Sequence, residues 1–271
     1  MRCFVAVMWR IMPCGVRGIF VYRVVYQGVC LVSSRTETVP VRTVPSGFRR
    51  ALLAPTIALL LLVSLVFAVA FVYLGEEVHE SATLTTDQRV LRAIDDQTAS
   101  WPVAVGNDVS LLGTEVVIGV VGVALAGWFL LRRRWLNALL FLGALGGYVI
   151  LTLLVKHVVN RERPVSYFRI PESGPSFPSG HTLGTTCLAF ALGFLLWQGA
   201  ASRGLKAIGT VALLLGVLLV ALSRLMLGVH YPTDVLGSML LGTAWMSVLI
   251  ALRSTVERWQ SVGMTPVPPD E

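Results

Sequence analysis

The stretch 136-LNALLFLGALGGYVILTLLV-155 decides the fold of this chain, because it contains no charged residue. The hydrocarbon core of a bilayer requires about 20 mostly apolar residues in helical conformation. Inside that core no water is available to the backbone, so a single segment satisfies its own N–H and C=O groups only as a helix. The segment therefore predicts a membrane-spanning helix.

Five further apolar runs have the same character. They cover residues 51–74, 111–131, 182–199, 205–222 and 235–252. The whole chain is 55% hydrophobic and 14% charged, with a mean hydropathy of +0.74, which is far from the composition of a soluble domain. We expect an all-α, polytopic membrane protein in which six transmembrane helices form a bundle.

Three parts are expected along the chain. They are a poorly ordered, basic cytoplasmic tail (1–50), a six-span domain (51–252) and a disordered cytoplasmic tail (253–271). Arginines interrupt every apolar stretch of the first tail, so it does not contain the continuous apolar core of a signal peptide. Translation could begin at Met1, at Met8 or Met12, or further downstream. The last tail is rich in proline, which is typical of disorder.

The positions of the basic residues predict the orientation. Lys and Arg next to span ends are retained in the cytoplasm. Arginine pairs or blocks at 49–50 and 132–134, and basic residues at 203–206 and 253–258, all fall on one side of a six-span path. We expect that side to be cytoplasmic. The Arg-rich, Lys-poor usage is typical of a GC-rich bacterial genome, so the predicted location is the bacterial plasma membrane.

Three polar clusters fall at span ends on the opposite, non-cytoplasmic side. The first holds Lys156 and, after six intervening residues, Arg163 followed by Pro164. An Arg fork binds phosphate oxygens in pairs, and Lys supplies a compact positive charge. Two basic residues at an interface could also simply extend toward water from the membrane edge.

The second cluster is 178-PSGH-181, directly before the fourth span. The N-terminus of a helix presents unpaired N–H groups and binds anions. Ser179 could donate a hydroxyl hydrogen bond, Gly180 allows close approach of the backbone, and His181 can carry a proton near neutral pH. The alternative is that Ser179 is only a helix cap and His181 an interfacial polar residue.

The third cluster contains Ser223 and Arg224, then His230, then Asp234 at the start of the sixth span. A carboxylate that holds one ring nitrogen of a histidine leaves the other nitrogen as a nucleophile and stabilises the positive ring. A His and an Asp four residues apart could instead be a pair on a helix surface. Two histidines, an aspartate and several cations together predict a site that handles phosphate.

Together the three clusters resemble the signature of the type 2 phosphatidic acid phosphatase superfamily. That signature reads Lys, six residues, Arg-Pro; then Pro-Ser-Gly-His; then Ser-Arg, five residues, His, three residues, Asp. All three parts are present in order at 156–164, 178–181 and 223–234, and the resemblance extends over about 111–252. It implies a lipid phosphatase with its active site at the non-cytoplasmic end of the bundle.

The resemblance also implies a role for each residue. His230 would attack phosphorus and form a phosphohistidine, Asp234 would orient His230, and His181 would protonate the leaving oxygen. Five residues would bind the phosphoryl oxygens: Lys156, Arg163, Ser179, Gly180 and Arg224. No metal and no cofactor is expected, and the partners are a lipid phosphate substrate and the bilayer.

Other functions remain as alternatives at this stage. A lipid phosphotransferase of the same family, vanadate-dependent halide oxidation, and a non-catalytic protein that binds or transports lipid phosphates would all need an anion site. The +7 formal charge does not indicate nucleic-acid binding, because no basic stripe is interleaved with aromatic residues. Undecaprenyl diphosphate, phosphatidylglycerophosphate and phosphatidic acid are all admissible substrates, and the sequence does not set the oligomeric state.

Overall fold

The structure is a computed structural model that describes residues 24–26, 29–31, 46–97, 100–164 and 172–262. The chain divides into two compact units, Met1–Leu52 and Leu53–Glu271. In the first unit, β1 (Val24–Tyr26) pairs antiparallel with β2 (Val29–Leu31). Most of the predicted N-terminal tail lies outside the described residues.

Within the described residues, six helical segments are long and apolar enough to cross a membrane, as predicted. They are Pro55–His79 of α1 (Ser46–His79), Ala104–Leu131 across α3 (Ser100–Leu111) and α4 (Glu115–Leu131), α5 (Trp135–Val159), α6 (Gly180–Gln198), α7 (Arg203–Met226), and Pro232–Gln260 of α8 (Pro232–Val262). The all-α class and the six-span bundle are therefore confirmed.

The end of α8 differs from the expected boundary. Residues 253–262, which we expected in a disordered tail, continue α8 as helix. Arg253 explains this extension, since its guanidinium donates to the side-chain oxygen of Asn137 at 2.7 Å and to that of Gln198 at 3.2 Å. These bonds connect α8 to α5 and α6. The rest of the predicted tail, 263–271, lies outside the described residues.

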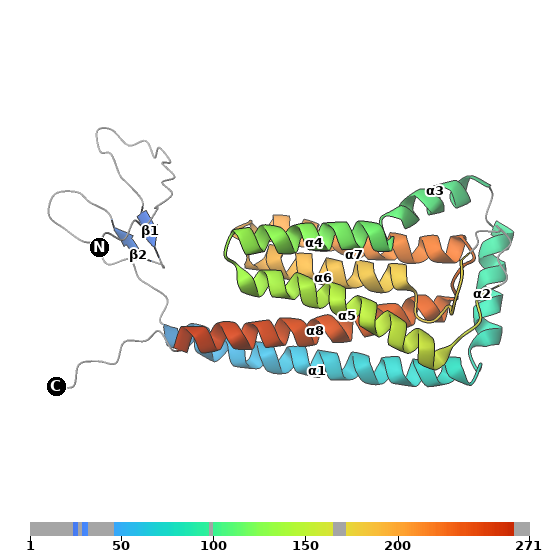
Figure 1. Cartoon of the computed structure of the whole chain (residues 1–271), viewed down its shortest axis with the longest axis horizontal. Helices are drawn as coiled ribbons and strands as arrows, with labels where there is room; N and C mark the ends of the chain where they lie inside the picture. The colour runs from blue at the N-terminus through green and yellow to red at the C-terminus, as the bar shows by residue number, and fades with distance from the viewer. Residues whose placement is uncertain (1–23, 27–28, 32–45, 98–99, 165–171, 263–271) are drawn as a thin grey trace. The chain divides into compact units, whose positions relative to one another are not determined.

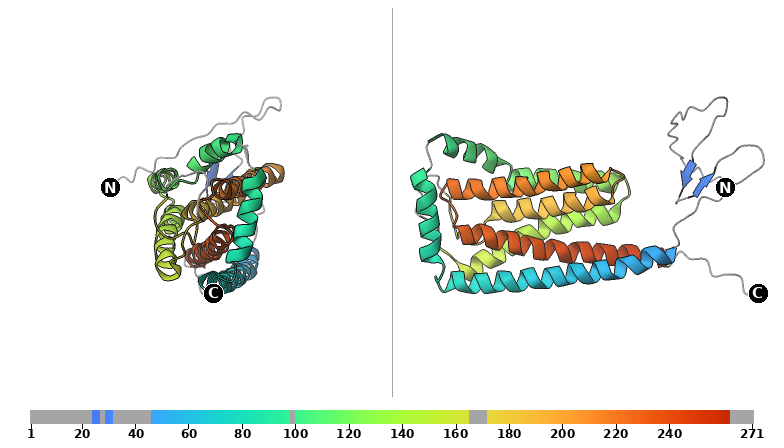
Figure 2. Two further views of the ribbon diagram at one scale, coloured as in Figure 1. Left: turned by 90° about the vertical axis from the view of Figure 1, so that its right-hand side faces the viewer. Right: turned by 180° about the vertical axis from the view of Figure 1, so that it is seen from behind.

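Helices α4 to α8 run side by side, and α6 packs against α5, α7 and α8 (Figure 1). Helix α1 runs alongside α8. Helix α2 (Leu84–Gln97) lies across one end of the bundle, as both views of Figure 2 also show. Helix α2 contacts α7 and α8. The C-terminal ends of α5 and α7 and the N-terminal ends of α6 and α8 meet at this end of the bundle, where α2 covers them.

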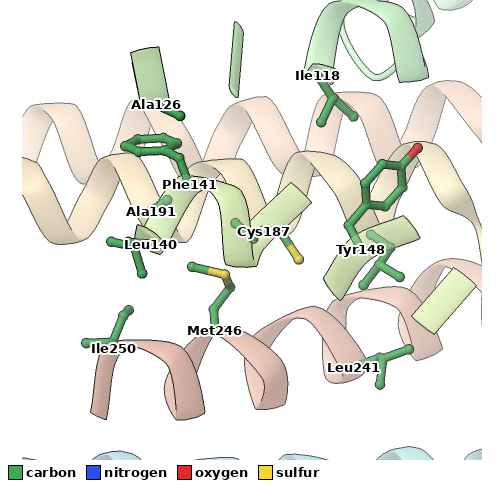
Figure 3. Packing of buried hydrophobic residues seen from close by; sticks show 12 residues of the cluster. Ile118, Ala126, Leu140, Phe141, Tyr148, Cys187, Ala191, Leu241, Met246 and Ile250 are labelled. Carbon is green, nitrogen blue, oxygen red and sulfur yellow. The ribbon is translucent and has the colours of Figure 1, made fainter. Parts of the chain in front are cut away.

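The core lies between α4, α5, α6 and α8 (Figure 3). Phe141 and Met246 are fully buried in it. Glycine allows close helix approach at Gly147, where an added Cβ would lie 2.0 Å from Nε1 of Trp245. That indole N–H donates to the carbonyl of Gly143 at 3.1 Å and so joins α8 to α5. Small residues at a helix interface permit this kind of packing.

Candidate active site

The three polar clusters meet at the end of the bundle that α2 covers. Nη1 of Arg163, just after α5, lies 3.3 Å from Nε2 of His230. The backbone N–H of Ser179 donates to the carbonyl of Asp234 at 3.4 Å, and the hydroxyl of Ser238 lies 3.0 Å from the carbonyl of Ser179. The segment after α5 thus contacts the segment before α8 through a side chain, and the segment before α6 contacts α8 through its backbone.

Ser179 and Gly180 begin α6, as the sequence predicts. Ser179 is fully buried, and its hydroxyl oxygen accepts a hydrogen bond from the N–H of Thr182 at 3.5 Å, so the residue is also a helix cap. The nearest atom to a Cβ added at Gly180 would be the Thr152 methyl group, 3.8 Å away. The free N–H groups of a helix start therefore lie next to the other two clusters.

His181 occupies the first turn of α6 and is half-buried. Its ring interacts electrostatically with Arg163 and Lys156. Lys156 lies in the last turn of α5, is also half-buried, and interacts electrostatically with Arg224 and Asp234. The second histidine and the lysine therefore belong to the same charged cluster as the arginines.

His230 and Asp234 form a pair between a loop and a helix. His230 precedes α8, and Asp234 is in the first turn of that helix. Oδ2 of Asp234 accepts from the N–H of Tyr231 at 2.8 Å and lies 3.4 Å from Nδ1 of His230. The alternative of a pair on a helix surface is therefore wrong, since both side chains are buried, 1% and 0% exposed.

The contacts of His230 determine which ring nitrogen carries the proton. An ionised carboxylate can only accept, so the proton belongs on Nδ1, which faces Asp234, and Nε2, 3.3 Å from Nη1 of Arg163, carries the lone pair. Burial lowers the pKa of His230 to about 4, although the Asp234 carboxylate opposes this shift. At neutral pH the ring is uncharged and the lone pair of Nε2 is available.

A glutamate carboxylate lies among the arginines of the site. Glu172 has Oε2 2.8 Å from Nη1 of Arg163 and 3.9 Å from Nε2 of His230, and its other oxygen contacts Nη2 of Arg224. Arg224 is 2% exposed and also donates to the hydroxyl of Ser110 on α3 at 2.5 Å. These cations therefore bind an oxyanion beside Nε2 of His230.

Backbone carbonyls fix the position of Arg163. Its Nε donates to the carbonyl of Gly174 and its Nη1 to that of Val229, both at 2.9 Å. Burial lowers the pKa of Arg163, while the negative charge of Asp234 opposes the shift. An arginine held in this way has lost its side-chain freedom before a ligand arrives, which favours binding.

Two further residues of the site were not identified from the sequence. Arg161 donates from Nη1 to Oδ1 of Asp234 and from Nη2 to Oδ2 of Asp87, each at 2.6 Å. Its guanidinium lies 4.1 Å from the ring centroid of Tyr231. Arg161 lies between Lys156 and Arg163 but occupies none of the fixed positions of the first motif. Asp87 gave no signal, since it is one of several acidic residues of a surface helix.

An apolar cavity adjoins the site. It has a volume of about 420 Å³ and lies between α1 and α5, with Phe71, Val155 and Phe177 among its lining residues. Phe177 is fully buried and stacks on Phe71 with ring centroids 5.8 Å apart. Phe177 directly precedes the 178–181 segment, so one wall of the cavity is next to that segment in the sequence.

Cations, amides and imidazoles make up the site. In the described part of the chain, no group of three or more His, Cys, Asp or Glu side chains could hold a metal ion. The carboxylate of Asp234 is engaged by Arg161 and the Tyr231 N–H, and that of Glu172 by two arginines. The donor set therefore suits a phosphoryl group.

Comparison with known proteins agrees with this geometry. The PAP2 superfamily profile matches residues 135–258. Decaprenylphosphoryl-5-phosphoribose phosphatase of Mycobacterium tuberculosis is 36% identical over 137 residues, which cover 47% of this chain and 68% of that protein. This chain belongs to the PAP2 superfamily. Phosphatidylglycerophosphatase B of Bacillus subtilis is 28% identical over 193 residues, which cover 70% of this chain and 94% of that protein.

A solved structure has the same fold. The crystal structure of a transmembrane PAP2-type phosphatidylglycerolphosphate phosphatase from Bacillus subtilis superposes with a TM-score of 0.66 at 26% identity, over 71% of this chain and 96% of that one. The chain is thus a multi-pass membrane protein and a lipid phosphatase of the PAP2 superfamily.

Proposed function

We propose that this protein removes a terminal phosphate from a lipid monophosphate or diphosphate, without a metal ion and through a phosphohistidine on His230. One observation carries the proposal. Nε2 of His230 lies 3.9 Å from an oxyanion, the Glu172 carboxylate, which Arg163 and Arg224 bind. A phosphoryl group in the place of that carboxylate would have its phosphorus in front of the nucleophile.

In the first step Nε2 of His230 forms a bond to phosphorus, and the bond from phosphorus to the lipid oxygen breaks. The ring becomes positively charged, and Asp234 opposite Nδ1 stabilises this charge. His181 gives its proton to the leaving oxygen. The position of His181 in the first turn of α6, next to Ser179 and Gly180, supports this role.

In the second step water attacks the phosphorus of the phosphohistidine. Neutral His181 takes a proton from that water, the bond between Nε2 and phosphorus breaks, and inorganic phosphate leaves. Both histidines then have the protonation state in which they began. The two steps together consume one water molecule and release the lipid product and inorganic phosphate, so no cofactor is required.

Fixed positive groups lower the barrier of both steps. Negative charge spreads over three equatorial oxygens during phosphoryl transfer, and catalysis consists mainly of positioning and electrostatic stabilisation. We assign this role to the cations Lys156, Arg163 and Arg224 and to the Ser179 hydroxyl and Gly180 N–H at the start of α6. The backbone contacts of Arg163 and the burial of Arg224 support preorganisation.

The membrane supplies the substrate. The apolar cavity between α1 and α5 suits an acyl or prenyl chain, because it opens beside the loop that carries the phosphate-binding residues. The named relatives act on phosphatidylglycerophosphate and on a prenyl-linked sugar phosphate, which have an apolar chain and a terminal phosphate in common. We infer that the head group enters from the outer face of the bacterial plasma membrane, since the Arg132–Arg134 block lies at the other end of the bundle.

The test measures phosphate release in detergent from phosphatidic acid, phosphatidylglycerophosphate and undecaprenyl diphosphate. His230→Ala should abolish release from every substrate that the wild-type protein cleaves. His157→Ala is the matched control, because His157 is exposed in the last turn of α5 and should leave the rate unchanged. Undiminished turnover by His230→Ala would contradict the assigned nucleophile.

A further inference from the structure

A buried carboxylate on α2 is part of the active-site network, although it belongs to none of the three motifs. Asp87 is 1% exposed. Its Oδ1 accepts from the N–H of Thr233 at 3.2 Å, and its Oδ2 accepts from the Thr233 hydroxyl at 2.5 Å and from Nη2 of Arg161 at 2.6 Å. Every one of these partners lies next to Asp234, either in sequence or in space.

Arg161 connects this carboxylate to the one that faces the nucleophile. Its Nη2 binds Asp87, and its Nη1 binds Oδ1 of Asp234 at 2.6 Å and the Thr233 hydroxyl at 2.8 Å. The side chain is 8% exposed, and its guanidinium carbon lies over the ring of Tyr231. Two carboxylates, one at each arm, therefore fix a guanidinium that is planar and rigid.

The contacts divide the two oxygens of Asp234 between two tasks. Oδ1 accepts from Arg161, while Oδ2 accepts from the Tyr231 N–H and faces Nδ1 of His230. The plane of the carboxylate is thus set from the side opposite the histidine. If Arg161 lost its second anchor, it could turn toward Asp234 with both arms and compete for Oδ2.

We propose that Asp87 and Arg161 are positioning residues, which orient Asp234 and through it the nucleophilic His230. The inference rests on the proposed function, because it assumes that His230 attacks phosphorus. It also assigns a role to α2. This helix places Asp87 at the site, although Asp87 is 74 residues before Arg161 in the sequence. Helix α2 is then part of the catalytic apparatus.

A purely structural role for the same contacts makes a different prediction. Asp87 also connects α2 to the start of α8 through Thr233, so its loss could simply loosen that helix. Loosening would lower stability and would not move the pKa of His230 in a defined direction. A positioning role acts through charge, and the two partners carry opposite charges.

The groups that face His230 determine the expected shifts. They are Asp234 from α8, Arg163 from the loop after α5, Arg224 from α7 and Glu172 from the loop before α6. Asp87→Asn removes a negative charge that partly neutralises Arg161. The positive charge of Arg161 then acts on Asp234 alone, the Asp234 carboxylate stabilises a positive His230 ring less well, and the pKa of His230 falls. With Arg161→Gln, Asp234 loses its cation and the pKa rises.

The experiment compares Asp87→Asn with Asp96→Asn, the same change at an exposed position of α2. The activity of both variants is measured with the lipid phosphate that the wild-type protein cleaves fastest. Their melting temperatures are measured as well. A catalytic group displaced by an ångström loses about a hundredfold in rate, so we expect about a tenfold fall in kcat for Asp87→Asn, with KM nearly unchanged. Asp96→Asn should behave as wild type.

Arg161→Lys and Arg161→Gln complete the test. Arg161→Lys keeps the charge without the fork, so its kcat should fall while the pH profile stays in place. Arg161→Gln should move the acidic limb of kcat/KM to higher pH, and Asp87→Asn should move it to lower pH. Equal kcat for Asp87→Asn and Asp96→Asn would overturn the inference, as would activity losses that follow the melting temperature without opposite pH shifts. If His230→Ala retained activity, the proposed function would fail first.

Discussion

Acidification should leave His230, the proposed nucleophile, uncharged to an unusually low pH. The ring of His230 is buried, and Arg163 and Arg224 add positive charge around it. Both effects disfavour a charged imidazole, and Asp234 compensates for them only in part. The pKa is therefore lowered from 6.5 to about 4.

The size of the effect is large enough to measure. At pH 5.5, a histidine with the ordinary pKa of about 6.5 is only about 9% neutral. With a pKa of about 4, the ring of His230 is about 97% neutral at the same pH. The nucleophilic form should thus be about tenfold more abundant than in an ordinary histidine.

Nitrogen NMR of protein labelled at histidine measures this directly. The chain has four histidines, and the difference between wild type and His230→Gln identifies the signals of His230. We expect an unprotonated Nε2 and a protonated Nδ1 from pH 7.5 down to about pH 5, with free histidine in the same buffer as the standard. A midpoint near that of the standard, or a proton on Nε2, would refute the reasoning.

The same shift has a consequence for stability. Between pH 6.5 and about 4, the unfolded chain carries a proton on this imidazole and the folded chain does not. The contribution of His230 to the free energy of unfolding is therefore complete above pH 6.5. It is lost as the pH drops toward 4, by at most about 3 kcal/mol. The melting temperature of wild type should fall more steeply over this range than that of His230→Gln.

Three further predictions concern the anion site, the packing and metal ions. Glu172→Gln should strengthen inhibition by vanadate about fivefold, equivalent to about 1 kcal/mol, because the carboxylate competes for the same arginines; an unchanged inhibition constant would exclude this competition. Gly147→Ala should destabilise the bundle by about 1–3 kcal/mol, because its Cβ would meet Trp245, whereas Gly146→Ala meets nothing within 4 Å and should leave the melting temperature unchanged. Phosphate release should persist in EDTA, and its loss would contradict the metal-free mechanism.

The membrane helices were predictable from the sequence because hydrophobic length alone determines them. All six predicted spans are present, although the helices extend past the apolar residues at most ends. Helix α1, for example, continues to His79 through two glutamates, since helical hydrogen bonding does not stop where the apolar side chains stop. Composition therefore predicts the part of a helix that the bilayer requires, and not the whole helix.

The convergence of the motif residues was predictable only in outline. Lys156, His181 and His230 each lie at a span end on the same side, so their proximity follows from an even number of crossings. The partners of the motif residues could not be found in this way. Asp87 meets Arg161 across 74 positions, and which acidic residue of α2 faces the bundle depends on how that helix lies across its end.

The orientation of α2 shows the same limit. The spacing of Val90, Leu91 and Ile94 in the sequence is typical of an interfacial helix over 86–96 with these residues facing lipid. The helix is present at Leu84–Gln97, but Leu91 and Ile94 line a cavity with Tyr231 at the start of α8. An amphipathic pattern predicts an apolar face without identifying what covers it.

The length of α6 determines how deep the chemistry lies. Its 19 residues extend over about 28 Å, slightly less than the roughly 30 Å of hydrocarbon in a bilayer. Since Ser179 and His181 stand at one end of this short helix, we expect them at the boundary between the hydrocarbon core and the phosphate layer. A phosphate that is anchored by its chains already sits at that height, so the enzyme can work without lifting its substrate out of the leaflet.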